Sequence, residues 1–95
     1  MTTSTRKTRE RSWKKRGIKG ATVTLYNKLL KEQGGVCAIC LRPPKTRRLA
    51  FDHNHRTGEP RGLLCWSCNY DLGVVEKNFA RTPDRLTRML AYLKR

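Results

Sequence analysis

The sequence predicts a small α+β domain in which a short β-hairpin lies between helices and four cysteines staple the chain. Three observations predict this fold. The chain has only 95 residues, of which 37% are apolar, and so short a chain buries a modest core that often needs an additional staple. Two Cys-x-x-Cys pairs bracket two short apolar runs of the length of strands. Apolar residues at helical spacing lie on both sides of this region.

Charge points to the kind of partner. The chain has 22 Lys and Arg against 7 Asp and Glu, a net charge of +15, which favours a polyanion and most simply nucleic acid. An anionic membrane surface is the weaker alternative, because no amphipathic basic helix with bulky aromatic residues stands out. The N-terminus lacks the apolar segment of a secretory signal, and no apolar run approaches the ~20 residues of a membrane span. We therefore expect a soluble, cytoplasmic protein.

Residues 1–20 are the most basic stretch, and Trp13 and Ile18 are its only large apolar residues after Met1. Such a block is typical of a flexible arm, which divides the chain into an arm at 1–20 and a domain at 21–95. The arm could be a solubilising tail or, in a eukaryotic source, a nuclear localisation signal, but we favour contacts with DNA phosphates. With the loop and turn that follow, the candidate DNA-binding residues are Arg6, Lys7, Arg9, Arg11, Lys14, Lys15, Arg16, Lys19, Lys45, Arg47, Arg48 and Arg56.

The first helix of the domain is expected to begin at Thr22, which can act as its N-cap, and to end at Gly34-Gly35. Its apolar residues recur at helical spacing, namely Val23, Tyr26, Leu29 and Leu30. A basic loop over 41–48 follows, and Pro43-Pro44 argues against regular structure there. The most economical reading of the helix's apolar face is that it packs in the core.

A hairpin is expected next. Residues 49–53 predict a strand, residues 54–60 a turn containing Thr57-Gly58, and residues 61–64 the returning strand. The second cysteine pair should then open a helix that ends near Gly73. A last helix should begin at Thr82-Pro83, since proline suits the first helical position. Its apolar face could close the core or meet a second subunit, and the core is favoured; that face comprises Leu86, Met89, Leu90 and Leu93.

The four cysteines predict a zinc site. Two residues between the members of each pair let a tight turn present both sulfurs to one ion at about 2.3 Å. Four protein ligands leave no open position, so the Zn²⁺ should be structural, with Cys37, Cys40, Cys65 and Cys68 as ligands. In a reducing compartment this is favoured over two disulfides or a redox motif. In so small a domain the binding of zinc would supply much of the folding free energy.

The hairpin between the cysteine pairs carries a polar cluster, Asp52-His53-Asn54-His55. Asp52 at the end of the first strand and Asn69 on the following helix could approach one point, where carboxylate and amide oxygens suit Mg²⁺. His53, with an intrinsic pKa of about 6.5, could take a proton from an attacking water. Taken singly, these residues could be a surface pair, turn residues and a helix-start residue. Their combination favours a catalytic centre.

Three segments carry a family resemblance: Gln33-Gly-Gly-Val-Cys-Ala-Ile-Cys40, Leu49-Ala-Phe-Asp-His-Asn-His-Arg-Thr-Gly58 and Pro60-Arg-Gly-Leu-Leu-Cys-Trp-Ser-Cys-Asn69. Together they closely resemble the phage recombination endonuclease VII family, which belongs to the wider HNH, or ββα-metal, nucleases. The resemblance covers roughly residues 18 to 93. It implies a zinc-stapled ββα-metal (HNH) core with flanking helices and a basic N-terminal arm.

The resemblance also implies roles for single residues. Asp52 and Asn69 would hold a catalytic divalent metal, Mg²⁺ or Mn²⁺, and His53 would be the general base. His55 matches a further family histidine that orients a neighbour or contacts phosphate. The expected activity is DNA hydrolysis to 5′-phosphate and 3′-hydroxyl ends.

The best-known resemblance is to a resolvase of four-way, or Holliday, junctions, in which an additional C-terminal region builds an intertwined dimer. This chain ends at Arg95, soon after one helix, so nicking or cutting at one site is favoured over paired cleavage of a junction. Small phage proteins of this kind also act beside the genome-packaging machinery, so a homodimer and packaging proteins are both candidate partners. The alternatives to an endonuclease are a non-catalytic zinc-ribbon-like DNA-binding protein and, ranked last, a zinc-stabilised module that binds protein through the final helix.

Overall fold

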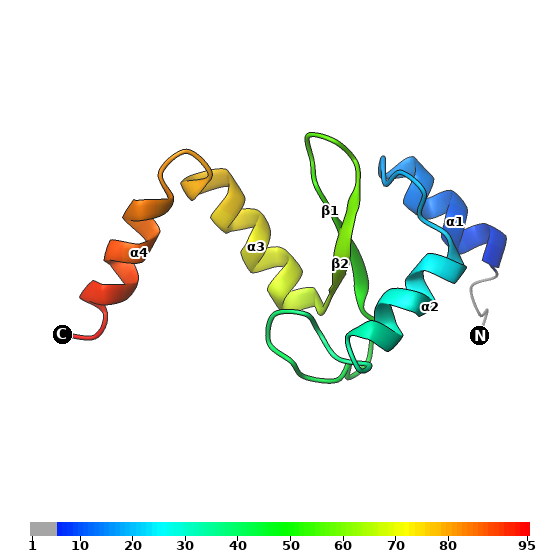
Figure 1. The fold of residues 1–95 in the computed structure, drawn as a ribbon, viewed down its shortest axis with the longest axis horizontal. Coiled ribbons are helices and arrows are strands. Elements are labelled where there is room, and N and C mark those ends of the chain that lie inside the picture. The colour runs from blue at the N-terminus through cyan, green and yellow to red at the C-terminus, as the bar shows by residue number, and fades with distance from the viewer. Residues whose placement is uncertain (1–5) are drawn as a thin grey trace.

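A computed structural model describes residues 6–95 and has the predicted class, a small α+β fold. The described part of the chain measures 48 × 28 × 25 Å. A central hairpin has α1 and α2 on one side and α3 on the other, with α4 beyond α3 (Figure 1). Its elements are, in order, α1 (Arg6–Lys15), α2 (Val23–Glu32), β1 (Ala50–His53), β2 (Pro60–Leu64), α3 (Trp66–Phe79) and α4 (Pro83–Tyr92).

The hairpin is antiparallel and confirms the prediction for residues 49–64. Phe51 pairs with Leu63 and Asp52 with Gly62, but His53 pairs with Pro60, so one residue of β2 bulges out of the ladder. That residue is Arg61. A bulge re-aims a side chain and increases the local twist, and here it lies beside the polar end of β1.

The side chain of Asn54 stabilises the turn of the hairpin, a role that asparagine often has in turns. The side-chain Oδ1 of Asn54 accepts hydrogen bonds from the N–H groups of Arg56 and Thr57 at 2.8 and 3.1 Å. Gly58 has a φ of +81°, and an added Cβ would lie 2.8 Å from the Gly17 carbonyl oxygen. The tip of the hairpin is therefore closely covered by the segment that follows α1.

That contact corrects the prediction of a flexible arm over residues 1–20. Residues 1–5 lie outside the described part, but residues 6–15 form α1, and Trp13 and Ile18 are buried. Trp13 stacks on Tyr26 at 5.6 Å between ring centroids and meets Phe51 edge-on at 4.7 Å. The burial of these two large apolar side chains outweighs the solvation of the basic residues around them, because all of those residues except Arg9 stay exposed. The division of the chain at residue 20 itself stays a prediction.

The second helix confirms its predicted ends. The Thr22 hydroxyl accepts a hydrogen bond from the Leu25 N–H at 3.1 Å, and a Glu10 carboxylate oxygen from α1 accepts one from the Val23 N–H at 2.8 Å. After Gln33, Gly34 and Gly35 have φ of +69° and +77°, which is the left-handed conformation that ends helices. Both termini of α2 are thus satisfied, one of them by the segment that was expected to be free.

Two predictions about the last helices are wrong. Gly73 lies inside α3 rather than at its end, because an isolated glycine costs a helix only about 1 kcal/mol relative to alanine and Leu72, Val74 and Val75 continue the helix around it. The start of α4 at Pro83 is as predicted. Its apolar face does not close the core, because α4 packs against α3 at the far end from the hairpin (Figure 1). The exposed residues of this face include Met89, Leu90 and Leu93.

No helix among residues 6–95 combines the length and the apolar character needed to cross a bilayer.

Candidate metal centre and active site

The four cysteines meet at one point, as their spacing predicted. Their sulfur atoms all lie within 4.8 Å of one another, and none is in a disulfide. The Sγ atoms of Cys40 and Cys65 are 3.8 Å apart, close to the edge of roughly 3.8 Å that a tetrahedron of sulfurs with Zn–S bonds of about 2.3 Å requires. The donor set and its dimensions therefore fit a structural Zn²⁺.

The backbone shapes the first half of this site. Leu41 has a φ of +62°, and its N–H donates to the Cys37 carbonyl while the Cys37 N–H donates to the Arg42 carbonyl, both at 3.0 Å. The Ala38 N–H donates to the Leu63 carbonyl at 3.1 Å. The turn is thereby fixed against β2, so a metal ion in the site ties the end of α2 and the hairpin to the start of α3.

The thiols of the cluster affect one another's protonation. Burial opposes ionisation of the Cys37 thiol, but N–H groups of Cys65, Cys40 and Ile39 outweigh it and lower its pKa to about 6. The pKa of the Cys68 thiol is instead raised to about 12, first by its hydrogen bond with the Cys65 side chain and then by burial. Protons alone leave neighbouring sulfurs with opposite preferences, whereas a metal ion favours thiolate at all four.

Asp52 is the centre of the second cluster. It is the one charged residue among 6–95 that is buried, with 7% of its surface exposed. Arg61, the bulged residue of β2, donates from Nε to Asp52 Oδ2 at 2.7 Å and from Nη2 to Oδ1 at 2.9 Å. A buried carboxylate requires such compensation. The end of β1 is therefore built to hold a negative charge against a positive one.

The same arginine joins the hairpin to α3. Arg61 Nη2 also donates to Glu76 Oε1 at 2.6 Å, and these two carboxylates together raise the pKa of Arg61. Glu76 follows Asn69 by seven positions, which is nearly two helical turns, so both lie on one face of α3. Leu72 of that face packs against the core. Asn69 thus lies on the hairpin side of α3, although its side chain makes no hydrogen bond with Asp52 or His53 among the described residues.

His53 and His55 lie together at the end of β1, with ring centroids 4.5 Å apart. Burial and the neighbouring His55 lower the pKa of His53, and Asp52 only partly opposes them. The His53 imidazole is accordingly neutral at neutral pH, which is the form that accepts a proton. No hydrogen bond joins His53 to Asp52, Asn69 or His55 within residues 6–95.

The predicted DNA-binding residues fall into three groups. Arg6, Lys7, Arg9, Arg11, Lys14 and Lys15 lie on α1, Arg16 and Lys19 follow it, and the rest lie on the 41–48 loop or at the hairpin turn. Three of the arginines pack against other side chains: Arg6 pairs with Glu10 at 3.5 Å, Arg9 lies over the rings of Trp13 and Tyr26, and Arg47 lies over the ring of Trp66. The remaining predicted DNA-binding residues are all exposed.

Comparison with known protein families matches residues 8–95 to recombination endonuclease VII. The chain belongs to that family. Among phage proteins it is similar to the Gene 59 protein of Mycobacterium phage D29, with 40% identity over 88 residues that cover 88% of this chain and 51% of that protein. It is 47% identical to the Gene 59 protein of Mycobacterium phage L5 over 66 residues, or 65% of this chain and 40% of that protein. The chain therefore spans about half the length of these relatives or less.

The sequence did not predict two residues of this candidate site, Arg61 and Glu76. Arg61 lies directly before Gly62 in the segment 60–69, but its contact with Asp52 depends on a bulge that has no local sequence signal. Glu76 was beyond the expected end of α3 at Gly73. If the helix had been predicted to continue past Gly73, the seven-residue spacing would have placed Glu76 on the same face as Asn69.

We expect Arg61→Gln to lower the free energy of unfolding by roughly 1–3 kcal/mol, because it removes two charge-assisted hydrogen bonds from a buried carboxylate. Arg61 is 37% exposed in its side chain, so the loss should lie towards the lower figure. Urea unfolding followed by circular dichroism measures it. Arg6→Gln is the matched control, since its ion pair with Glu10 is exposed and should contribute about 0–0.5 kcal/mol. Equal losses in the two variants would contradict a special role for Arg61.

Proposed function

We propose that this chain is an HNH-type, metal-dependent DNA endonuclease that hydrolyses phosphodiester bonds to 5′-phosphate and 3′-hydroxyl ends. Membership of the endonuclease VII family points to a nuclease. The observation that carries the proposal is the Arg61 bridge, which brings the end of β1, with Asp52 and His53, against the face of α3 that bears Asn69. A protein that only binds DNA has no need of a buried carboxylate, a neutral imidazole and an amide in this arrangement.

The donor types suit a hard divalent cation. Asp52 and Asn69 would hold Mg²⁺ or Mn²⁺ through carboxylate and amide oxygens. When bound, the metal would stabilise negative charge on the scissile phosphate and on the leaving 3′ oxygen. Arg61 already binds both oxygens of Asp52, so that carboxylate is held in one orientation against positive charge.

His53 would act as the general base. Its neutral imidazole accepts the proton of a water whose oxygen forms the new bond to phosphorus, while the bond from phosphorus to the 3′ oxygen breaks. His55, beside it at 4.5 Å, would orient the His53 ring or contact the phosphate. The basic residues of α1, the 41–48 loop and the hairpin turn would hold the DNA backbone, so affinity should fall steeply as salt rises.

The same proposal places the chain on DNA in the cytoplasm of the host cell, as expected for a relative of phage proteins. The exposed apolar face of α4 is where a second copy or a packaging protein would bind.

The test is nicking of a supercoiled plasmid by the pure protein with Mg²⁺ or Mn²⁺, beside reactions with no divalent metal added. The metal is omitted rather than chelated, because a chelator would also draw on the zinc site. We expect His53→Ala to lower the rate by roughly 10²- to 10⁴-fold, the usual contribution of a general base. Asn27→Ala, an exposed change on α2, should leave the rate unchanged.

Further measurements distinguish the proposed function from its alternatives. Zinc content and circular dichroism of His53→Ala should match the unaltered protein, so that lost cleavage reports lost chemistry. A synthetic four-way junction distinguishes resolution from general nicking. Tight DNA binding with no cleavage in either metal, and no effect of His53→Ala, would make the protein a non-catalytic zinc-containing DNA-binding protein.

A further inference from the structure

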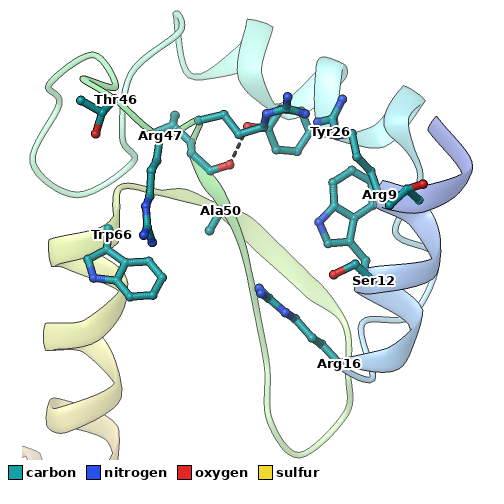
Figure 2. A pocket seen from close by; sticks show the side chains of 12 residues that line it. Arg9, Ser12, Arg16, Tyr26, Thr46, Arg47, Ala50 and Trp66 are labelled. Atoms are coloured by element: carbon teal, nitrogen blue, oxygen red, sulfur yellow. Dashed lines mark hydrogen bonds between the residues drawn. The ribbon is translucent and has the colours of Figure 1, made fainter. Parts of the chain in front are cut away.

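A cleft of about 520 Å³ lies beside the start of β1, between α1 and the first residue of α3 (Figure 2). Pockets of roughly 300–1,000 Å³ are the size that small molecules and single nucleotide units occupy. Arg9 and Arg16 reach it from the α1 side, Arg47 and Arg48 from the 41–48 loop, and Trp66 from α3. The cleft thus joins residues far apart in the sequence, and it does not contain Asp52, His53 or Asn69.

The lining is positively charged and contains no acidic side chain, although Glu10, outside it, acts electrostatically on Arg9. Four arginines line the cleft and no Asp or Glu does. Among residues 6–95, the ion pairs of arginine involve only Arg6 and Arg61. Four guanidinium groups without carboxylate partners are an arrangement that binds anions, and phosphates in particular.

Arg9 supplies a second sign of a missing anion. Its Nε atom is buried and has no hydrogen-bond partner, although buried donors are almost always paired. Its guanidinium lies 4.7 Å from the centre of the Tyr26 ring and 5.1 Å from that of Trp13. Burial, and then the nearby charge of Arg48, lower the pKa of Arg9. An anion in the cleft would relieve the repulsion between Arg9 and Arg48.

Trp66 supplies a flat apolar surface at the opposite wall. It is 64% exposed, and the guanidinium of Arg47 lies over its ring at 4.7 Å (Figure 2). Exposing so large an aromatic side chain contributes little to the fold. A ring beside a cationic groove is the combination with which proteins bind single-stranded nucleic acid, because bases stack on it whatever their sequence.

We propose that this cleft binds an unpaired nucleotide of a DNA strand, with the base stacked on Trp66 and the flanking phosphates held by the arginines. In a duplex both faces of each base are covered by neighbours, so stacking on Trp66 requires a base that is single-stranded or turned out of the helix. Ala50 lines the cleft, and His53 is three residues further along β1, roughly 10 Å at the rise of a strand. The inference rests on DNA as the substrate in the proposed function.

Binding is measured by fluorescence anisotropy of labelled DNA with zinc-loaded protein and no added divalent metal, so cleavage does not contribute. The ligands are a short oligothymidylate, an abasic sugar-phosphate oligomer of the same length and a blunt duplex. We expect Trp66→Ala to weaken binding of the oligothymidylate about 5- to 150-fold, the effect of losing one stacked base. Trp66→Phe should restore most of it, and binding of the abasic oligomer should be unaffected by either variant.

Tyr92→Ala is the matched control. Tyr92 is 68% exposed and is also covered by a guanidinium, that of Arg95, but it lies on α4, away from the cleft. This variant should bind the oligothymidylate like the unaltered protein. Intrinsic fluorescence gives a second readout, because oligothymidylate should quench the unaltered protein more strongly than Trp66→Phe, whose remaining tryptophan, Trp13, also lines the cleft but is buried.

Two results would overturn the inference. Unchanged affinity of Trp66→Ala for oligothymidylate would remove Trp66 from the site. If Trp66→Ala weakened binding of the oligothymidylate, the abasic oligomer and the duplex equally, the cleft would be a general phosphate-binding surface. A protein that passes these binding tests yet fails to nick DNA in Mg²⁺ or Mn²⁺ would refute the proposed endonuclease and leave the nucleotide site standing.

Discussion

Cys68→Ser will leave the chain largely unfolded. A structural zinc site contributes about 10–16 kcal/mol of binding free energy in small domains at neutral pH, whereas whole domains are stable by only about 5–15 kcal/mol. Here the sulfurs converge within 4.8 Å and join the turn after α2 and the end of the hairpin to the start of α3. Cys68 itself is half-buried, so the loss will come from the metal rather than from an apolar cavity.

Far-UV circular dichroism and zinc content measure this result. The unaltered protein should contain about one zinc ion per chain and unfold cooperatively, and Cys68→Ser should lose most of the helical signal. Ser67→Ala is the control, because Ser67 lies in the same turn and is exposed. A strong chelator should unfold the unaltered protein, and added Zn²⁺ should refold it. A variant that keeps a native spectrum and a cooperative transition without zinc would refute the structural role of the site.

Much of the scaffold could be predicted because its signals are local. The two Cys-x-x-Cys pairs, the cap at Thr22 and the proline at 83 each depend on a few adjacent residues and simple geometry. The paired apolar runs at 49–53 and 61–64 specify the hairpin in the same way. The structure has these elements at the predicted positions, and the four sulfur atoms lie together as the spacing predicted.

The features that could not be predicted depend on contacts between distant segments. The contact of Arg61 with Asp52 follows from a bulge, and a bulge is decided by the register of the whole hairpin. The length of α3 beyond Gly73 follows from packing and from Glu76, which is bound by that same Arg61. The exposure of α4 follows from its position at the far end of α3. In each case the local signal was ambiguous and tertiary structure decided the outcome.

The N-terminal segment is the clearest such case. Its charge is typical of a flexible arm, yet it contains Trp13, a large aromatic residue that packs between α1, α2 and β1. Trp13 stacks on Tyr26 and meets Phe51 edge-on, while Ile18 is buried beside them. This docking also brings Arg9 and Arg16 to the cleft that faces Trp66. The order of α1 therefore has consequences for binding as well as for stability.

We accordingly expect Trp13→Ala to lower the free energy of unfolding by about 3–5 kcal/mol, the cost of removing a large aromatic side chain from a core. Urea or thermal unfolding measures the loss. Trp66→Ala is the matched control, since it removes the same side chain from an exposed position and should cost roughly 0.5–1 kcal/mol, mainly the contact with Arg47.

The two variants also separate stability from binding. Trp66→Ala should bind oligothymidylate weakly while remaining stable, whereas Trp13→Ala should lose stability and release the arginines of α1 from their fixed positions. If Trp13→Ala unfolds like the unaltered protein, α1 is not docked in solution. Residues 6–20 would then be the flexible arm that their charge suggests, and the cleft would lack one wall until DNA orders it.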